Sequence, residues 1–205
     1  MIHTKKLFLI LNILSLGALA NFQPYAGEPP QMTLTPDQQT QVAQGKLVFL
    51  LDNTKGETKE GSVAFRVNAR QDAIWKILSD FSKYSEWSYK VNDAKAESLG
   101  GDRMLVDFTA SVVKQHYYVI NNFPMKDWAT WNTDHTKAND CVLDTVGFWR
   151  IKPVDGNPNQ SDVIQYGKIK LTSLCANGFF GIGGFNAHDM ANQIYTNLKA
   201  RSEAL

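Results

Sequence analysis

Two segments of the chain carry apolar residues at the three- and four-residue spacing of an amphipathic helix. The first segment runs from Arg70 to Phe81 and the second from Ala187 to Ala204. The apolar stripes consist of Ala73, Ile74, Ile77, Leu78 and Phe81 in the first segment and of Ala187, Met190, Ala191, Ile194 and Leu198 in the second. Stripes of this kind pack against an apolar surface. Both segments are therefore predicted to be helices that cover a sheet.

A shorter helix is predicted at residues 37–44. Thr35 is suited to cap this helix, Pro36 to occupy its first position, and Gly45 to end it. The apolar run 46–52 that follows is typical of a strand. The helix and this run together form an N-terminal extension of the domain, from Leu34 to Asp52.

Alternation of apolar and polar residues predicts strands in the middle of the chain. Residues 62–67 alternate in this way, and the stretch from Ala94 to about Ser173 is rich in strand-forming residues with turn signals between them. Within that stretch, residues 104–121 suffice for one bent strand or two, with an apolar and a polar face. The pattern favours a meander of antiparallel strands.

The last hairpin can be registered from its turn, which the sequence places at Gly156 to Asn159. Counting outward from that turn sets Cys141 opposite Cys175. The inward face then contains Leu143, Thr145, Gly147, Trp149 and Ile151 on one strand and Gln165, Gly167, Ile169, Leu171 and Ser173 on the other. The outer face contains Asp144, Arg150, Lys168 and Lys170, which we expect to be solvated.

The first twenty residues have the three parts of a secretory signal peptide. A basic start is followed by an apolar run from Leu7 to Leu16 and by small residues at Ala18 and Ala20. The run is too short for a typical membrane span, so cleavage near Ala20 and a periplasmic or secreted location are predicted. Residues 21–33, with three prolines, are expected to form an extended leader, and residues 34–205 to form the domain.

Composition indicates one domain with one core, since 43% of the residues are apolar and 11% are aromatic. The formal net charge is +1, with both signs mixed along the chain, which is not typical of a nucleic-acid-binding surface. We expect a monomer that binds no nucleic acid.

The two cysteines, Cys141 and Cys175, are expected to form a disulfide, because exported proteins mature in an oxidising compartment. Their spacing fits neither a metal motif nor a C-x-x-C dithiol. We expect no metal ion and no cofactor.

No catalytic motif stands out. His116, His135 and His188 have no carboxylate in a motif with them, and a structural or surface role is favoured for each. The segment Phe179 to Gly184 lacks the residues of a phosphate-binding loop and reads either as an ordinary connection or as a hinge that admits ligand or touches a membrane.

The stretch from Val63 to Trp87 resembles the entry to the START-like, or SRPBCC, helix-grip superfamily, which includes polyketide cyclases and dehydratases and lipid-transfer domains. The resemblance is carried by the helix 73–81 and by the Ser-Lys-Tyr-Ser-Glu-Trp sequence after it. It implies an α+β fold in which a curved antiparallel sheet wraps around a long C-terminal helix. It also implies an apolar cavity under that helix, of roughly 300 Å³ or more if it holds a ligand.

The residues expected to line this cavity are apolar or aromatic and lie on the inner strand faces and on the last helix. They are Phe108, Val112, Tyr118, Trp149, Ile169, Leu171, Met190 and Ile194. The leading hypothesis is an exported protein that binds or transports a lipid, sterol or polyketide-like molecule.

Two alternatives remain open. A cyclase or dehydratase would need titratable groups such as His116 or Asp107 beside the cavity. A module that binds another envelope protein would use the aromatic connection from Tyr84 to Trp87 and the leader.

Overall fold

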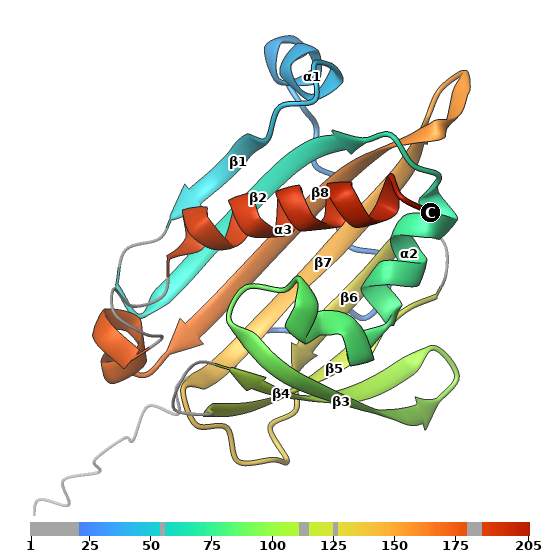
Figure 1. Ribbon diagram of the computed structural model, residues 1–205. Helices are drawn as coiled ribbons and strands as arrows, with labels where there is room; N and C mark the ends of the chain where they lie inside the picture. The colour runs from blue at the N-terminus through green and yellow to red at the C-terminus, as the bar shows by residue number, and fades with distance from the viewer. Residues whose placement is uncertain (1–20, 54–55, 111–114, 125–126, 180–185) are drawn as a thin grey trace, which may run out of the picture.

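A computed structural model describes residues 21–53, 56–110, 115–124, 127–179 and 186–205 of the 205-residue chain. Eight antiparallel strands form one sheet in the order β1-β2-β8-β7-β6-β5-β4-β3, and the sheet curves around the C-terminal helix α3 (Figure 1). The predicted helix-grip α+β fold is confirmed. The elements are α1 (Pro36–Ala43), β1 (Val48–Asn53), β2 (Thr58–Val67), α2 (Gln71–Ser79), β3 (Val91–Gly100), β4 (Arg103–Ala110), β5 (Gln115–Asn122), β6 (Trp128–Thr133), β7 (Val142–Val154), β8 (Asn157–Leu171) and α3 (Ala187–Ser202).

Helix α3 lies across the concave face of the sheet and buries the stripe that its sequence predicts. Ala191, Ile194 and Leu198 are buried in the main core. Asn186 caps the helix, because its side chain accepts hydrogen bonds from the backbone N–H groups of residues 188 and 189. Within the described ranges, no helix combines the length and the hydrophobicity that a membrane span requires.

Helix α2 is shorter than the periodicity predicts. It ends at Ser79, and a 3₁₀ helix, Phe81–Glu86, follows it. This change of direction turns Phe81 and Tyr84 into the core, where the Tyr84 hydroxyl donates a 2.7 Å hydrogen bond to the carbonyl of Leu78. The aromatic connection therefore closes one end of the concave face.

The β7–β8 hairpin has the predicted faces in a register that differs by two residues. Thr145 lies opposite Ile169, and Trp149 lies opposite Gln165. Counting from the expected turn predicts, for each of these two β7 residues, a partner two residues further along β8. The tight turn is formed by residues 155 and 156, because Gly156 adopts the positive φ that a two-residue hairpin loop needs. A shift of two leaves every side chain on the same face.

A second irregularity lies at the start of β7. The pairing shifts between Val142 and Asp144, so Val142 is buried and Leu143 is 41% exposed. The expectation that Leu143 faces inward is therefore wrong.

The disulfide between Cys141 and Cys175 is present, with 5.7 Å between the two Cα atoms. Cys141 directly precedes β7, but Cys175 lies in a single turn of π-helix, Cys175–Phe179, beyond the end of β8. The bond therefore joins a strand to this turn and is not a cross-strand bridge. Its sulfur atoms are buried in a small cluster with Ala110, Val142 and Leu171.

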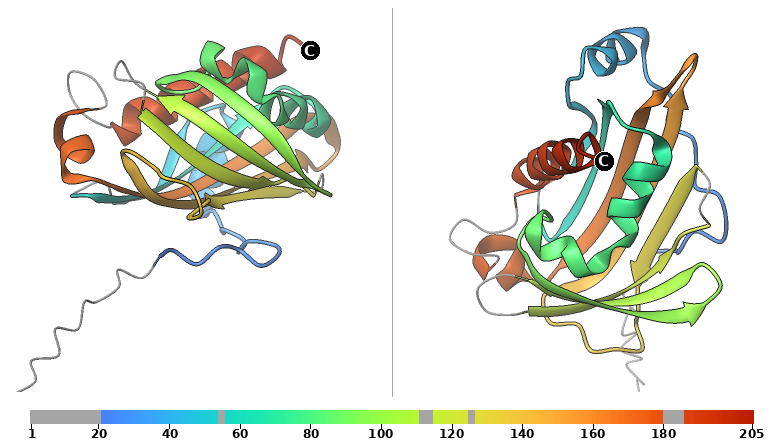
Figure 2. Two further views of the ribbon diagram at one scale, coloured as in Figure 1. Left: turned by 90° about the horizontal axis from the view of Figure 1, so that it is seen from below. Right: turned by 45° about the vertical axis from the view of Figure 1, so that its right-hand side comes forward.

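Residues 21–33, which we call the N-terminal segment, lie on the side of the sheet opposite α3 (Figure 2, left). The backbone N–H of Phe22 donates a 2.5 Å hydrogen bond to Asp144, and the ring of Tyr25 packs edge-on against Phe148 at 5.5 Å. The segment is extended, as its prolines predict, and it covers β7 and β8.

The expectation that Asp144 and Arg150 are solvated is wrong, because the N-terminal segment buries both. They do lie on the outer face, but they are only 5% and 3% exposed. The guanidinium of Arg150 donates to the carbonyls of Pro29 and Pro30 and pairs with Glu28 at 2.9 Å. Burial of these charged groups is tolerable because the segment supplies their partners.

Removing the disulfide is expected to lower the free energy of unfolding by about 3–4 kcal/mol, because the bond closes a loop with a sequence separation of 34 residues. Urea unfolding of the double variant Cys141→Ala and Cys175→Ala should match that of the reduced native chain. A double variant that is as stable as the oxidised chain would contradict the structural role.

Tyr25→Ala is expected to lower the free energy of unfolding by about 1–2 kcal/mol, because it removes the ring that packs on Phe148. Gln23→Ala is the matched control, since Gln23 is exposed in the same segment and its loss should cost under about 0.5 kcal/mol. Equal effects of the two variants in urea unfolding would show that the segment contributes little.

Candidate functional site

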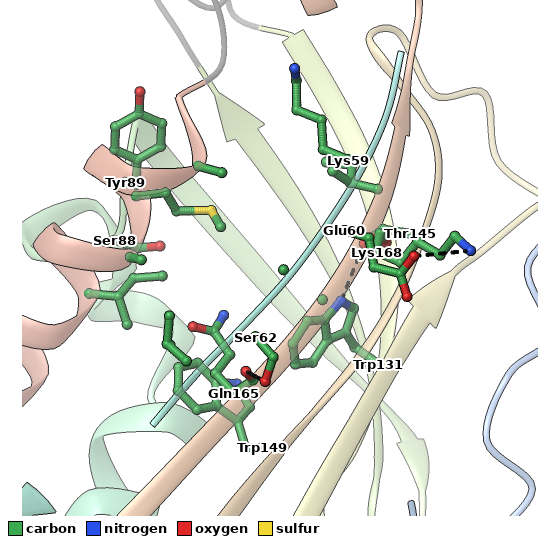
Figure 3. Close-up of a pocket in the computed structure, with 18 of the residues that line it drawn as sticks. Lys59, Glu60, Ser62, Ser88, Tyr89, Trp131, Thr145, Trp149, Gln165 and Lys168 are labelled. Carbon is green, nitrogen blue, oxygen red and sulfur yellow. Dashed lines mark hydrogen bonds and ion pairs between the residues drawn. The ribbon is translucent and has the colours of Figure 1, made fainter. Parts of the chain in front are cut away.

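A cavity of about 220 Å³ lies between the concave face of the sheet and α3. All eight strands, helix α3 and the connection after α2 contribute to its wall, and most of this wall is apolar (Figure 3). The volume is below the roughly 300 Å³ that we expected of a ligand site. The cavity therefore suits one compact molecule.

The floor of the cavity is the indole of Trp131, which lies over a pair of glycines. Gly147 on β7 and Gly167 on β8 are directly opposite each other, and Trp131 on β6 is opposite Gly147. A Cβ atom at Gly147 would collide with the Trp131 ring and with the backbone oxygen of Tyr166. The indole N–H donates a 3.3 Å hydrogen bond to the hydroxyl of Thr145, which fixes the ring on this floor.

One wall of the cavity is a stack of aromatic rings. Phe108 lies parallel to Tyr117 at 5.1 Å, and Tyr84 packs against both Phe108 and Trp87. The backbone carbonyl of Trp87 accepts a 2.8 Å hydrogen bond from Asn197, which ties the wall to α3. Burial raises the pKa of both Tyr84 and Tyr117 above the ordinary value of a phenol, so both rings stay neutral.

Neutral polar side chains also face the cavity. The carboxamide of Gln165 on β8 points into it beside Trp149 (Figure 3). Tyr117 and Asn121 line it from β5. The wall therefore combines an apolar surface with a few groups that can form hydrogen bonds.

Of the eight residues expected to line the cavity, the structure brings five together around it. These five are Phe108, Trp149, Ile169, Met190 and Ile194. Val112 lies outside the described residues. That the five bind a ligand remains a prediction.

Tyr118 and Leu171 do not line the cavity. Phe108 pairs with Tyr117, so strand alternation turns Tyr118 to the outer face beside Asp107. Leu171 ends β8 and packs around the disulfide with Cys141 and Cys175. The expectation for Tyr118 is wrong because β4 and β5 are separate strands, and the alternation of inward and outward positions changes phase between them.

Sequence reasoning did not select Trp131, Tyr117 or Gln165 as lining residues. The hairpin register did place Gly147 and Gly167 on the inner face, and two small residues on neighbouring inward positions leave room for a large ring. This signal would have pointed to an aromatic residue on the next strand.

Each histidine that the sequence singled out has a carboxylate partner that no motif indicated. His116 contacts Asp107 at 3.0 Å, His135 contacts Asp144 at 3.2 Å, and His188 contacts Asp52 at 2.8 Å. None of the three histidines lines the cavity, although Asp52 lies at its rim. Across the part of the chain that the structure describes, no group of three or more His, Cys, Asp and Glu side chains could hold a metal ion.

The aromatic connection from Tyr84 to Trp87 is not an exposed patch, because both rings are buried in the core. This observation removes the surface that a protein-interaction module was expected to use. The glycine-rich segment expected to act as a hinge lies outside the described residues from Phe180 to Gly184.

No family model matches the sequence, and no curated protein matches it. Solved structures share the fold. The STAR-related lipid transfer protein from Xanthomonas axonopodis is 11% identical, with a TM-score of 0.53, over 77% of this chain and 98% of that one. A START superfamily protein from Mycobacterium smegmatis is 15% identical, with a TM-score of 0.51, over 71% of this chain and 97% of that one.

A third structure with this fold is the di-domain ARO/CYC StfQ from the steffimycin biosynthetic pathway. It is 11% identical, with a TM-score of 0.55, over 72% of this chain and 51% of that one. At these identities the similarity shows a START-like fold.

Gly147→Ala is expected to lower the free energy of unfolding by about 2–3 kcal/mol, because the added methyl group overpacks the floor and displaces Trp131. Gly167→Ala is the matched control, since the same methyl group there would contact Trp131 at an ordinary 3.5 Å. Urea unfolding checks both variants, and a Gly147→Ala chain as stable as the Gly167→Ala chain would show that the floor yields easily.

Proposed function

We propose that this chain is an exported protein that binds, and carries, one hydrophobic small molecule in the cavity between the sheet and α3. The observation that carries the proposal is the cavity itself, about 220 Å³ in volume and walled mainly by apolar side chains. A cavity of this composition favours an apolar molecule, because the molecule leaves water on entry. The five lining residues that the sequence indicated are proposed to contact it.

The disulfide supports export. Stable disulfides form in oxidising compartments and are rare in the cytosol, and Cys141 and Cys175 are joined in a buried cluster. We propose that the N-terminal leader is cleaved near Ala20 and that the product, a monomer, works in the periplasm or outside the cell.

Other proteins with this fold support a small-molecule ligand. They include a lipid transfer protein and an ARO/CYC protein of a biosynthetic pathway. The proposal for this chain includes no catalytic step, because His116 and Asp107, the titratable groups named for catalysis, pair with each other on the outer face. The proposed partner is thus a lipid, sterol or polyketide-like molecule.

Transient contact with a membrane would suit delivery of such a molecule. Leu174 and Leu143 are 62% and 41% exposed and flank the disulfide, and Leu174 directly precedes the turn that leads toward α3. We propose this end of the molecule as the side that meets a membrane.

Ala191→Leu is expected to weaken uptake strongly, because Ala191 lines the cavity from α3 and a larger side chain takes up part of the cavity volume. The full chain is expressed in a bacterium and purified, and binding of naphthalene is measured by equilibrium dialysis. The variant should bind naphthalene about tenfold or more weakly than the native chain, because naphthalene loses its enclosed apolar contact with the cavity wall. Mass spectrometry of organic extracts identifies any molecule that purifies with the protein, and the mass of the chain reports cleavage near Ala20.

Ala200→Leu is the matched control, since Ala200 is exposed on the same helix and its substitution leaves the cavity unchanged. Native protein that takes up no naphthalene and carries no apolar molecule would overturn the proposed function. Equal binding by the two variants would place the bound molecule elsewhere.

A further inference from the structure

Three neutral polar side chains in the cavity wall have hydrogen-bonding capacity that the protein leaves unused. Gln165 on β8 and Tyr117 and Asn121 on β5 all line the cavity. Among the described residues, the Gln165 carboxamide and the Tyr117 hydroxyl contact no hydrogen-bonding group, and Asn121 makes only a long 3.4 Å bond to the carbonyl of Val119. The indole N–H of Trp131 is not available to a ligand, because it already donates a hydrogen bond to the hydroxyl of Thr145.

These groups lie on two sides of the floor formed by Trp131, with Gln165 on one side and Tyr117 and Asn121 on the other. Gln165 is paired with Trp149, whereas Tyr117 packs near the disulfide cluster and Asn121 is paired with Trp131 itself. A molecule resting on the indole would therefore meet a polar group on either side. A purely apolar occupant would displace water from these groups and leave them unsatisfied, which is costly.

The charged residues of the wall mostly point elsewhere. Glu60 and Lys168 pair with each other (Figure 3) on the outer side of the sheet. There the Lys168 ammonium lies over the ring of Phe22. Asp52 is occupied by His188 at the rim. Lys59 faces the cavity opposite Ile169, and it has an interaction of its own. Apart from Lys59, the described side chains that face the centre of the cavity are thus neutral.

We propose that the ligand is a compact, neutral, ring-containing molecule with a hydroxyl or carbonyl group, and that Gln165, Tyr117 and Asn121 select it by hydrogen bonding. The aromatic floor and wall select the ring, and the volume excludes both acyl chains of a phospholipid. Burial keeps the Tyr117 hydroxyl protonated, since it raises the pKa of that group, so the hydroxyl remains a donor. This inference rests on the proposed function.

The test compares three probes that share one ring system, namely naphthalene, 2-naphthol and 2-naphthoate. Equilibrium dialysis with the native full chain should give affinity for 2-naphthol about tenfold above that for naphthalene, the worth of a single hydrogen bond, and weaker binding of 2-naphthoate. Gln165→Leu and Tyr117→Phe should each reduce 2-naphthol binding several-fold and leave naphthalene binding unchanged or stronger.

Tyr166→Phe is the matched control. Tyr166 neighbours Gln165 on β8, but its hydroxyl donates to Glu60 on the outer face. This variant should bind all three probes as the native chain does. Thermal unfolding of each variant without probe verifies that it folds, and Asn121→Leu provides a further variant if one of the others does not.

The outcomes separate the two proposals. Native protein that binds none of the probes and carries no apolar molecule overturns the proposed function and this inference with it, and protein that carries such a molecule but binds none of the probes overturns the inference alone. Equal binding of naphthalene and 2-naphthol, or variants that do not discriminate between them, overturns the inference alone. Tightest binding of 2-naphthoate also overturns it and assigns the site to carboxylates held by Lys59.

Discussion

The contact of Trp131 with two glycines determines the shape of the site. Gly147 and Gly167 lie opposite each other on the two longest strands, and their lack of side chains lets the indole lie close to the backbone of β7 and β8. If Gly147 carried a side chain, its Cβ atom would collide with the ring, and the indole would have to leave its place on the strands. The free volume under the helix is therefore created at the sheet surface, and the aromatic wall and the helix stripe only enclose it.

The sheet separates polar chemistry by face. Charged pairs such as Glu60–Lys168 and Glu28–Arg150 lie on the convex side, whereas the concave side holds neutral amides and phenols among apolar side chains, with the Asp52–His188 pair at its rim and Lys59 facing the cavity. Strand alternation makes this possible, because adjacent residues such as Gln165 and Tyr166 belong to different environments. A substitution on β8 thus affects either ligand selection or outer-face packing, according to whether its position is odd or even.

Periodicity predicted the parts of the fold whose signal lies within one element. Helix α3 and its stripe follow from a helical period, and the inner face of β7 follows from alternation. Errors occurred where one element meets the next. The phase of Tyr118 depends on how β4 turns into β5, and the hairpin register depends on which residue adopts the positive φ at Gly156. The cavity itself could not be predicted, because the stacking of Trp131 on two glycines involves three strands and depends on a register known only to within two residues.

The N-terminal segment also imposes an order on folding. Its bonds to Arg150 join residues 120 or more positions apart in sequence, so it can dock only after β7 and β8 have formed. The residues synthesised first among those the structure describes thus bind partners that are synthesised much later. Until they do, Phe148 and Tyr166 stand uncovered on a convex surface that also exposes the guanidinium of Arg150 without the partners that the segment supplies. A chain caught at that stage would be prone to associate through this surface, and docking of the segment covers it.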